Sequence, residues 1–65
     1  MQEKKPMNKL KAARILRGYK QAELSERCGV RVETYAKYEQ GVRRPSFETI
    51  KKIAEVLNVE VSELI

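Results

Sequence analysis

The sequence predicts an all-α fold, a compact bundle of five short helices, from three observations. Its 65 residues suffice for one small domain. Its three glycines, at positions 18, 29 and 41, separate segments of about eight to twelve residues, which is the length of a short helix. No stretch alternates apolar and polar residues with a period of two, so no strand is expected.

Capping residues and glycines delimit the first two helices. The first is expected at residues 8–17, because Asn8 can cap its start and Gly18 suits a left-handed position just past its end. The second is expected at residues 21–28, and Gly29 marks its end.

The remaining helices follow the same logic. The third is expected at residues 32–40 and is followed by Gly41. Ser46 can cap a fourth helix at residues 47–57, whose apolar residues recur with the spacing i, i+3, i+4 and i+7. A last short helix is expected at residues 61–65, where apolar side chains can meet the core or a partner.

Aromatic side chains are expected in the core and not as surfaces for base stacking. They are Tyr19, Tyr35, Tyr38 and Phe47. By their spacing, the apolar residues Leu16 and Ile65 fall off the core face, and such exposed groups could join a dimer interface.

The composition excludes most of the side-chain groups that enzymes use for catalysis. The chain has no histidine and one cysteine, Cys28, so it cannot form a Cys/His metal cluster, a disulfide scaffold or a His-activated nucleophile within one chain. We therefore expect no enzyme, no metal, no cofactor and no small-molecule substrate. No apolar run approaches the ~20 residues of a membrane helix, and the charged start is unlike a signal peptide. Because a single cysteine cannot build a disulfide scaffold, a cytoplasmic location is expected.

The net charge of +5 is unevenly distributed along the chain. Residues 1–20 hold seven basic side chains and one acidic side chain, and residues 43–52 hold four basic side chains and one acidic side chain. The segment between them is nearly neutral, and residues 53–65 are acidic. Two basic segments of this kind indicate a surface for a polyanion.

The most informative stretch is residues 21–40, in which two short helices are joined by a tight turn at Gly29. Apolar residues on both sides of the turn can lock the two helices at a steep angle. This arrangement is the helix-turn-helix plan, in which the second helix can enter the major groove of DNA.

A wider pattern runs from about Leu10 to Leu64. Its residues are Arg14, Gly18, Gln21, Leu24, Gly29, Val30, Tyr38, Glu39, Gly41, Pro45, Ile53, Ala54, Leu57 and Leu64. With these residues at these spacings, the chain resembles the Cro/C1-type (XRE-like) helix-turn-helix family, which includes lambdoid phage repressors. The resemblance implies a lambda-repressor-like DNA-binding domain at residues 8–65. The lysines before it indicate a basic arm at residues 1–7. The resemblance also implies a bacterial or phage-encoded protein associated with the nucleoid.

Three residues depart from the family pattern. Ser25 stands where alanine is usual, and its small side chain still permits close helix packing. Arg31 stands where a serine or threonine often caps the recognition helix, which removes a cap worth about 1 kcal/mol. Tyr35 replaces the usual β-branched residue and makes the core bulkier.

The resemblance also assigns base contacts to the third helix. The residues that match the family's base contacts are Val32, Glu33, Thr34 and Lys37. Arg31 departs from the family, but its guanidinium would stand at the groove, so it is also expected to contact bases. Lys37 suits the acceptors of guanine, Glu33 can accept from cytosine, and the methyl groups of Val32 and Thr34 suit thymine. The alternative is an ordinary solvated face, since Glu33 and Lys37 also form a helix-stabilising i, i+4 pair.

Other residues are expected to hold the DNA backbone or the fold itself. The expected phosphate contacts are Gln21, Arg43, Arg44 and Lys20, with Lys9 and Lys11 as weaker candidates and Lys4 and Lys5 in the basic arm. In the family, the residues matching Arg14 and Glu39 form an ion pair between the first and third helices, so a structural role is expected for both.

The leading hypothesis is a sequence-specific transcriptional regulator, a repressor that binds a pseudo-palindromic operator in double-stranded DNA as a homodimer. The expected dimer contacts are Val61, Leu64 and Ile65. Two alternatives stay open: a protein-interaction module of the same fold, such as an antitoxin or switch regulator, and a small basic protein that coats nucleic acid without sequence preference.

Overall fold

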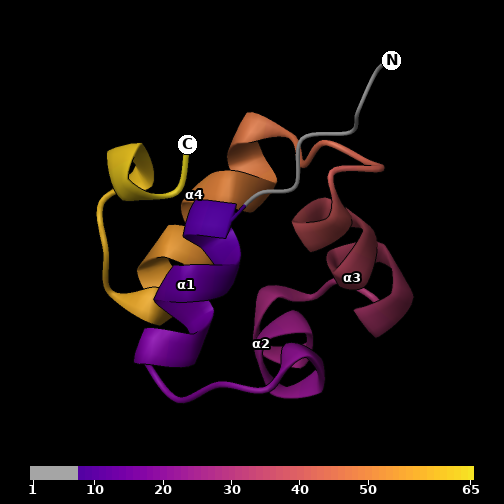
Figure 1. The fold of residues 1–65 in the computed structure, drawn as a ribbon, viewed down its shortest axis with the longest axis horizontal. Coiled ribbons are helices and arrows are strands. Elements are labelled where there is room, and N and C mark those ends of the chain that lie inside the picture. The colour runs from indigo at the N-terminus through magenta and orange to yellow at the C-terminus, as the bar shows by residue number, and fades with distance from the viewer. Residues whose placement is uncertain (1–7) are drawn as a thin grey trace.

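The computed structural model describes residues 8–65, which form four α-helices and one short 3-10 helix (Figure 1). They are α1 (Asn8–Leu16), α2 (Gln21–Cys28), α3 (Val32–Gln40), α4 (Phe47–Leu57) and η1 (Val61–Glu63). The all-α class is confirmed for the described residues. The basic arm predicted at residues 1–7, with Lys4 and Lys5, lies outside the described residues.

The predicted fifth helix is wrong in type. Residues at the chain end form only a 3-10 turn, closed by bonds from Glu63 N–H to the Glu60 carbonyl (2.9 Å) and from Leu64 N–H to the Val61 carbonyl (2.9 Å). The segment is too short to stabilise α-helical i→i+4 bonding, so the tighter i→i+3 turn forms instead. Helix α1 also ends one residue earlier than predicted, at Leu16.

The residues predicted to cap α2 and α4 lie at the ends of these helices. Gly29 takes a left-handed conformation at the end of α2 (φ 73°), a region that glycine enters without steric cost. The Ser46 hydroxyl accepts a hydrogen bond from Thr49 N–H (3.2 Å) and caps α4. Asn58 ends α4, also in the left-handed region (φ 59°).

One apolar core joins all the elements. Helix α2 packs against α3 and α4, α1 packs against α3 and η1, and η1 also packs against α4. The largest fully buried side chains are Tyr35, Leu10, Leu24, Ile53, Leu57 and Leu64. Tyr35 and Tyr38 meet edge to face, with ring centroids 6.2 Å apart.

The prediction of core aromatics is right for Tyr35 and Tyr38 and wrong for Phe47. Phe47 is 67% exposed, because it is the first residue of α4 and precedes by one turn the buried stripe that begins at Ile50. The Lys51 ammonium lies 5.6 Å from the centroid of its ring. Tyr19 is half-buried, and the Arg27 guanidinium lies 5.6 Å from its ring centroid.

The prediction that Leu64 contacts a dimer partner is also wrong. Its side chain is 1% exposed and belongs to the core of its own chain, because the turn of η1 directs it between α1 and α4. Leu16 and Ile65 are exposed, as their spacing predicts, and Val61 is partly buried. Within residues 8–65, no helix is long and apolar enough to cross a membrane.

Candidate nucleic-acid interface

Helix α3 lies along one side of the molecule and presents one face outward (Figure 1). Its inward face is formed by Tyr35, Tyr38 and Glu39, all of which are buried. The five residues predicted to contact bases lie on the other side or at its edge: Arg31, Val32, Glu33 and Lys37 are exposed, and Thr34 is partly exposed. All five side chains are therefore at least partly accessible, on α3 or at its N-cap.

The turn before α3 brings Arg31 to the start of this surface. Gly29 and Val30 close α2 through bonds from their N–H groups to the Glu26 carbonyl (3.2 Å) and the Ser25 carbonyl (2.9 Å). The chain then runs extended through Arg31 (φ −67°, ψ 146°), which occupies the N-cap position of α3 without a side-chain capping bond. This matches the loss of a hydroxyl cap expected from the sequence.

The loop after α3 is fixed to the end of that helix. The N–H groups of Val42 and Arg43 both donate to the Lys37 carbonyl (3.0 and 3.3 Å), and Pro45 is buried. Arg43 and Arg44 are both exposed between these anchors. The two guanidinium groups therefore project from a loop that is held against α3 and the core.

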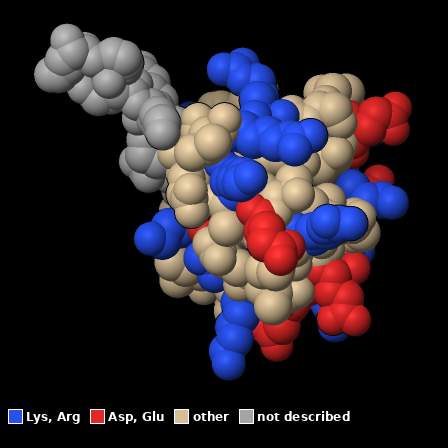
Figure 2. Space-filling model, turned by 90° about the vertical axis from the view of Figure 1, so that its right-hand side faces the viewer, with Lys and Arg blue, Asp and Glu red and all other residues tan. Residues whose placement is uncertain are grey.

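The charge of this side of the molecule is mixed. Figure 2 faces it and shows Lys and Arg side chains distributed over the surface, with acidic side chains between them. Along the chain, the exposed Glu33 of α3 stands between two exposed basic residues, the N-cap residue Arg31 and Lys37. Such a surface attracts a polyanion more weakly than a uniformly basic patch, but it also offers both donors and acceptors.

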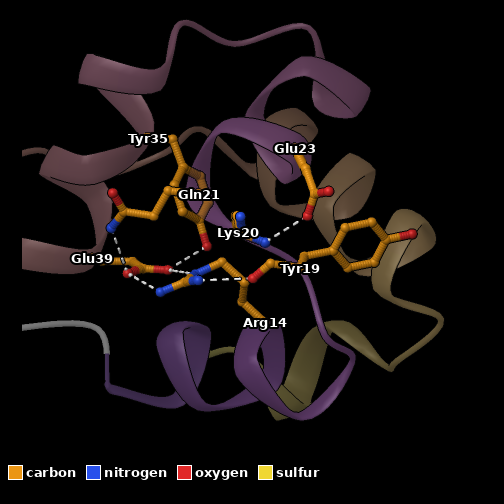
Figure 3. Close-up of polar contacts among 7 residues, drawn as sticks. All are labelled: Arg14, Tyr19, Lys20, Gln21, Glu23, Tyr35 and Glu39. Carbon is orange, nitrogen blue, oxygen red and sulfur yellow. Dashed lines mark hydrogen bonds and ion pairs between the residues drawn. The ribbon is translucent and has the colours of Figure 1, made fainter.

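The start of α2 holds the other two residues predicted to contact phosphate. Lys20 is the N-cap residue, and its backbone N–H donates to the Glu23 carboxylate (2.9 Å; Figure 3). Its side chain is exposed. Gln21, the first helical residue, is partly buried, because its side chain turns toward Glu39. The weaker candidate Lys9 lies elsewhere, with its ammonium 3.3 Å from the Ile65 carbonyl.

Arg14 and Glu39 form the ion pair that the resemblance implied. Arg14 Nε donates to Glu39 Oε2 (2.7 Å), Arg14 Nη2 donates to Glu39 Oε1 (3.3 Å), and Arg14 Nη1 donates to the Tyr19 carbonyl (2.8 Å; Figure 3). Both side chains are buried. The pair thereby ties α1 to α3 and also holds the connection between α1 and α2.

Two further partners of this pair were not predicted. Tyr35 donates its hydroxyl to Glu39 Oε2 (2.6 Å), and Gln21 Nε2 donates to Glu39 Oε1 (2.9 Å; Figure 3). A buried tyrosine usually finds a partner for its hydroxyl, and Tyr35 and Glu39 are four residues apart on one helix. That signal could have identified the tyrosine, whereas nothing in the sequence points to Gln21.

These contacts determine the charge states within the cluster. Burial alone would raise the pKa of Glu39, but hydrogen bonds from Arg14, Tyr35 and Gln21 outweigh it and hold this pKa below its ordinary value. The hydrogen bond to Glu39 raises the pKa of Arg14, and burial raises the pKa of Tyr35. At neutral pH the cluster is therefore a carboxylate, a guanidinium and a neutral phenol. Every buried side-chain nitrogen and oxygen of the described residues has a partner.

The fold and this outward helix define a helix-turn-helix domain. A sequence model described as "Helix-turn-helix" (HTH_3) matches residues 10–64. The chain belongs to this family, the Cro/C1-type helix-turn-helix regulators.

Relatives include two named transcriptional regulators. The transcriptional repressor RstR of the cryptic phage CTXphi, from Vibrio cholerae, is 34% identical over 58 residues, which are 89% of this chain and 52% of the relative. The HTH-type regulator YazB of Bacillus subtilis is 36% identical over 86% of this chain and 81% of its own length. The chain thus spans about half the length of RstR and most of YazB.

Solved structures share the fold. The restriction-modification controller protein C.AhdI from Aeromonas hydrophila superposes with a TM-score of 0.84 at 29% identity, over 89% of this chain and 88% of its own. The clp gene regulator ClgR from Corynebacterium glutamicum gives a TM-score of 0.83 at 23% identity, over 86% of this chain and 60% of its own, and shows the fold alone.

Proposed function

We propose that this chain is a sequence-specific double-stranded DNA-binding transcriptional regulator that inserts α3 into the major groove. The observation that carries the proposal is the division of α3 into two faces. Tyr35, Tyr38 and Glu39 fix the inward face in the core, and the outward face keeps its polar and small apolar side chains free for base edges. The names of RstR and C.AhdI, a repressor and a controller protein, support the same function.

The outward residues of α3 would contact base edges either through hydrogen bonds or through their methyl groups. Lys37 would donate to the N7 and O6 acceptors of guanine, and Glu33 would accept from the amino group of cytosine. Val32 and Thr34 would contact thymine methyl groups, and Arg31 would reach a base edge at the start of the helix. These contacts would carry sequence preference.

The surrounding residues would hold the DNA backbone. Arg43 and Arg44 extend from the loop after α3, and Lys20 and Gln21 stand at the start of α2, whose first N–H groups have no helical partner. Contacts of this kind fix orientation without reading sequence. The unit that binds would be the domain at residues 8–65.

We further propose that the regulator acts as a homodimer on a pseudo-palindrome and represses by occluding a promoter. One small domain supplies few base contacts, and a second copy raises affinity and specificity together. Val61 and Ile65 remain candidates for the dimer contact, whereas Leu64 is committed to the core. The two α3 helices would then lie about one helical turn of DNA apart.

Selection of random duplexes by the purified protein tests this function. The expected result is a consensus of two inverted half-sites with centres about 10 base pairs apart. If each protomer neutralises roughly four phosphates, log K should fall with log salt at a slope near −7 for the dimer. Equal affinity for random and selected duplexes would indicate a non-specific nucleic-acid coat instead. Binding that is nearly independent of salt would contradict the proposal.

A protein-interaction module of the same fold is a second candidate. The exposed apolar side chains of Ile15 (57%), Leu16 (80%) and Ile65 (66%) favour it, because such groups are common at protein interfaces. Capture experiments in the native host distinguish the two. A stable heterologous protein complex without any selected duplex would favour this candidate.

A further inference from the structure

Three helices converge on the carboxylate of Glu39 (Figure 3). Oε1 accepts from Gln21 Nε2 of α2 (2.9 Å) and from Arg14 Nη2 of α1 (3.3 Å). Oε2 accepts from Arg14 Nε (2.7 Å) and from the hydroxyl of Tyr35 on α3 (2.6 Å). The four bonds leave the carboxylate little freedom to rotate, because both of its oxygens are held from two sides.

Glu39 in turn fixes the side chain of Gln21. An ionised carboxylate can only accept hydrogen bonds, so the glutamine amide must present its nitrogen to Glu39 and not its oxygen. One of the two Nε2 protons is used in this bond, and none of residues 8–65 accepts the other. Gln21 is also the first residue of α2, the end of the helix at which backbone N–H groups have no helical acceptor.

Tyr35 is the one partner of Glu39 whose hydrogen bond can be removed without touching the Arg14–Glu39 ion pair or Gln21. Its ring is fully buried and its only side-chain hydrogen bond among the described residues goes to Glu39, so it does not itself face a ligand. Removing its hydroxyl would leave the Arg14–Glu39 pair in place and free one side of Oε2. Tyr35 also stands where the family usually has a β-branched residue, which has no comparable hydroxyl.

We infer that Glu39 and Tyr35 are positioning residues for a phosphate contact made by Gln21, with Glu39 orienting the glutamine amide and Tyr35 fixing the carboxylate. The inference rests on the proposed DNA binding and explains how the Gln21 amide is oriented for its phosphate contact. A side chain already held in its binding orientation loses less conformational freedom when the phosphate arrives. Affinity for DNA would therefore depend on a hydroxyl that never touches the DNA.

A double-mutant cycle on the selected duplex tests the inference. It compares the wild type, Gln21→Ala, Tyr35→Phe and the double variant at a temperature where thermal melts show all four folded. Tyr35→Phe should weaken binding about threefold or more when Gln21 is present and leave affinity nearly unchanged when residue 21 is alanine. A purely structural role of Tyr35 predicts the same factor in both backgrounds, and that result would overturn the inference.

A phosphate scan gives a readout that loss of stability alone would not move. Single phosphates of the duplex are replaced in turn by neutral methylphosphonates. The wild type should lose affinity at one position in each half-site where Gln21→Ala loses none, and Tyr35→Phe should lose an intermediate amount. The inference fails if the wild type and Gln21→Ala have identical scans.

If Tyr35→Phe does not fold, the wild-type protein still decides the question by NMR. The side-chain amide signals of Gln21 should shift as Glu39 protonates in acid, and one of its two protons should shift on addition of the selected duplex. Gln21 signals that respond to neither change would overturn the inference. A wild type that binds no duplex defeats the proposed function, whereas failure of these comparisons with a duplex bound defeats only the positioning role.

Discussion

Glu39 connects the stability of the domain to its candidate interface, because one buried carboxylate receives bonds from three helices. A buried ion pair adds little net stability over apolar packing, but removing one partner leaves the other charge uncompensated. Here the charge left behind would be the Arg14 guanidinium, whose remaining partner is the Tyr19 carbonyl (2.8 Å). Replacing Glu39 therefore lowers the free energy of unfolding by more than the loss of one negative charge suggests.

Replacing Glu39 by glutamine should strongly destabilise the fold. Breaking a buried pair costs about 3–5 kcal/mol, and each kcal/mol lowers the melting temperature of a domain this size by about 4–8 °C. We expect Glu39→Gln to melt more than about 10 °C below the wild type by circular dichroism. The matched control is Glu55→Gln, which alters an exposed side chain on α4 and should melt within a few degrees of wild type. Similar melts for both variants would show that the pair does not hold the helices together.

The same residue predicts how stability depends on pH. The pKa of Glu39 is lowered in the folded state, so its contribution is fully present above its unfolded pKa of about 4.5 and is lost as the pH falls through the lower, folded pKa. Urea unfolding of the wild type should therefore show a falling free energy of unfolding below about pH 4.5. Glu39→Gln should show a shallower fall over the same range, and parallel curves would contradict this assignment.

At the scale of the element, the N-cap position of α3 can serve either helix capping or contact with a ligand. Arg31 has the extended backbone of an N-cap residue but no side-chain acceptor for the free N–H groups of the helix. A guanidinium stands there instead, next to the outward face. In the proposed function, the N-cap position of α3 would offer a charge to DNA in place of a capping hydroxyl.

Arg31→Ser should separate these two effects. Serine can cap α3 and should stabilise the domain by about 1 kcal/mol relative to Arg31→Ala, which lacks both the cap and the charge. Both variants should bind the selected duplex more weakly than the wild type by a similar factor. Thermal melts and duplex titrations measure the two quantities. Equal melting temperatures for the serine and alanine variants would show that the position does not act as an N-cap.

How much the sequence predicts differs between elements for physical reasons. The glycines, Ser46 and the spacing of α4 predict the helix limits well, because caps and left-handed residues act locally. Phe47 has the right angular position for the core but stands one turn too early, and Leu64 fills the core because η1 folds back between α1 and α4. Gln21 joins Glu39 only through the tertiary arrangement of α2 and α3, which residue spacing along one helix does not encode.

At the scale of the whole molecule, the two sides of the domain have different tasks in the proposed function. Helix α3 and the loop with Arg43 and Arg44 occupy one side, and η1 with Ile65 lies toward the opposite side in Figure 1. A partner at η1 would therefore leave the outward face of α3 free. In that function the net charge of +5 would favour attraction to DNA, and the mixed charge on the α3 side would weaken binding that is independent of sequence.

The central claim is that α3 reads sequence and the following loop holds the backbone, and one set of titrations tests it most directly. The wild type, Lys37→Ala and Arg43→Ala are titrated against the selected duplex and against duplexes with single base-pair changes in each half-site. Lys37→Ala should flatten the preference at one position per half-site by about 1–3 kcal/mol, whereas Arg43→Ala should weaken all duplexes alike and make the salt slope shallower by about 1 per protomer. Lys37→Ala that weakens every duplex equally and leaves the base preferences unchanged would contradict the claim.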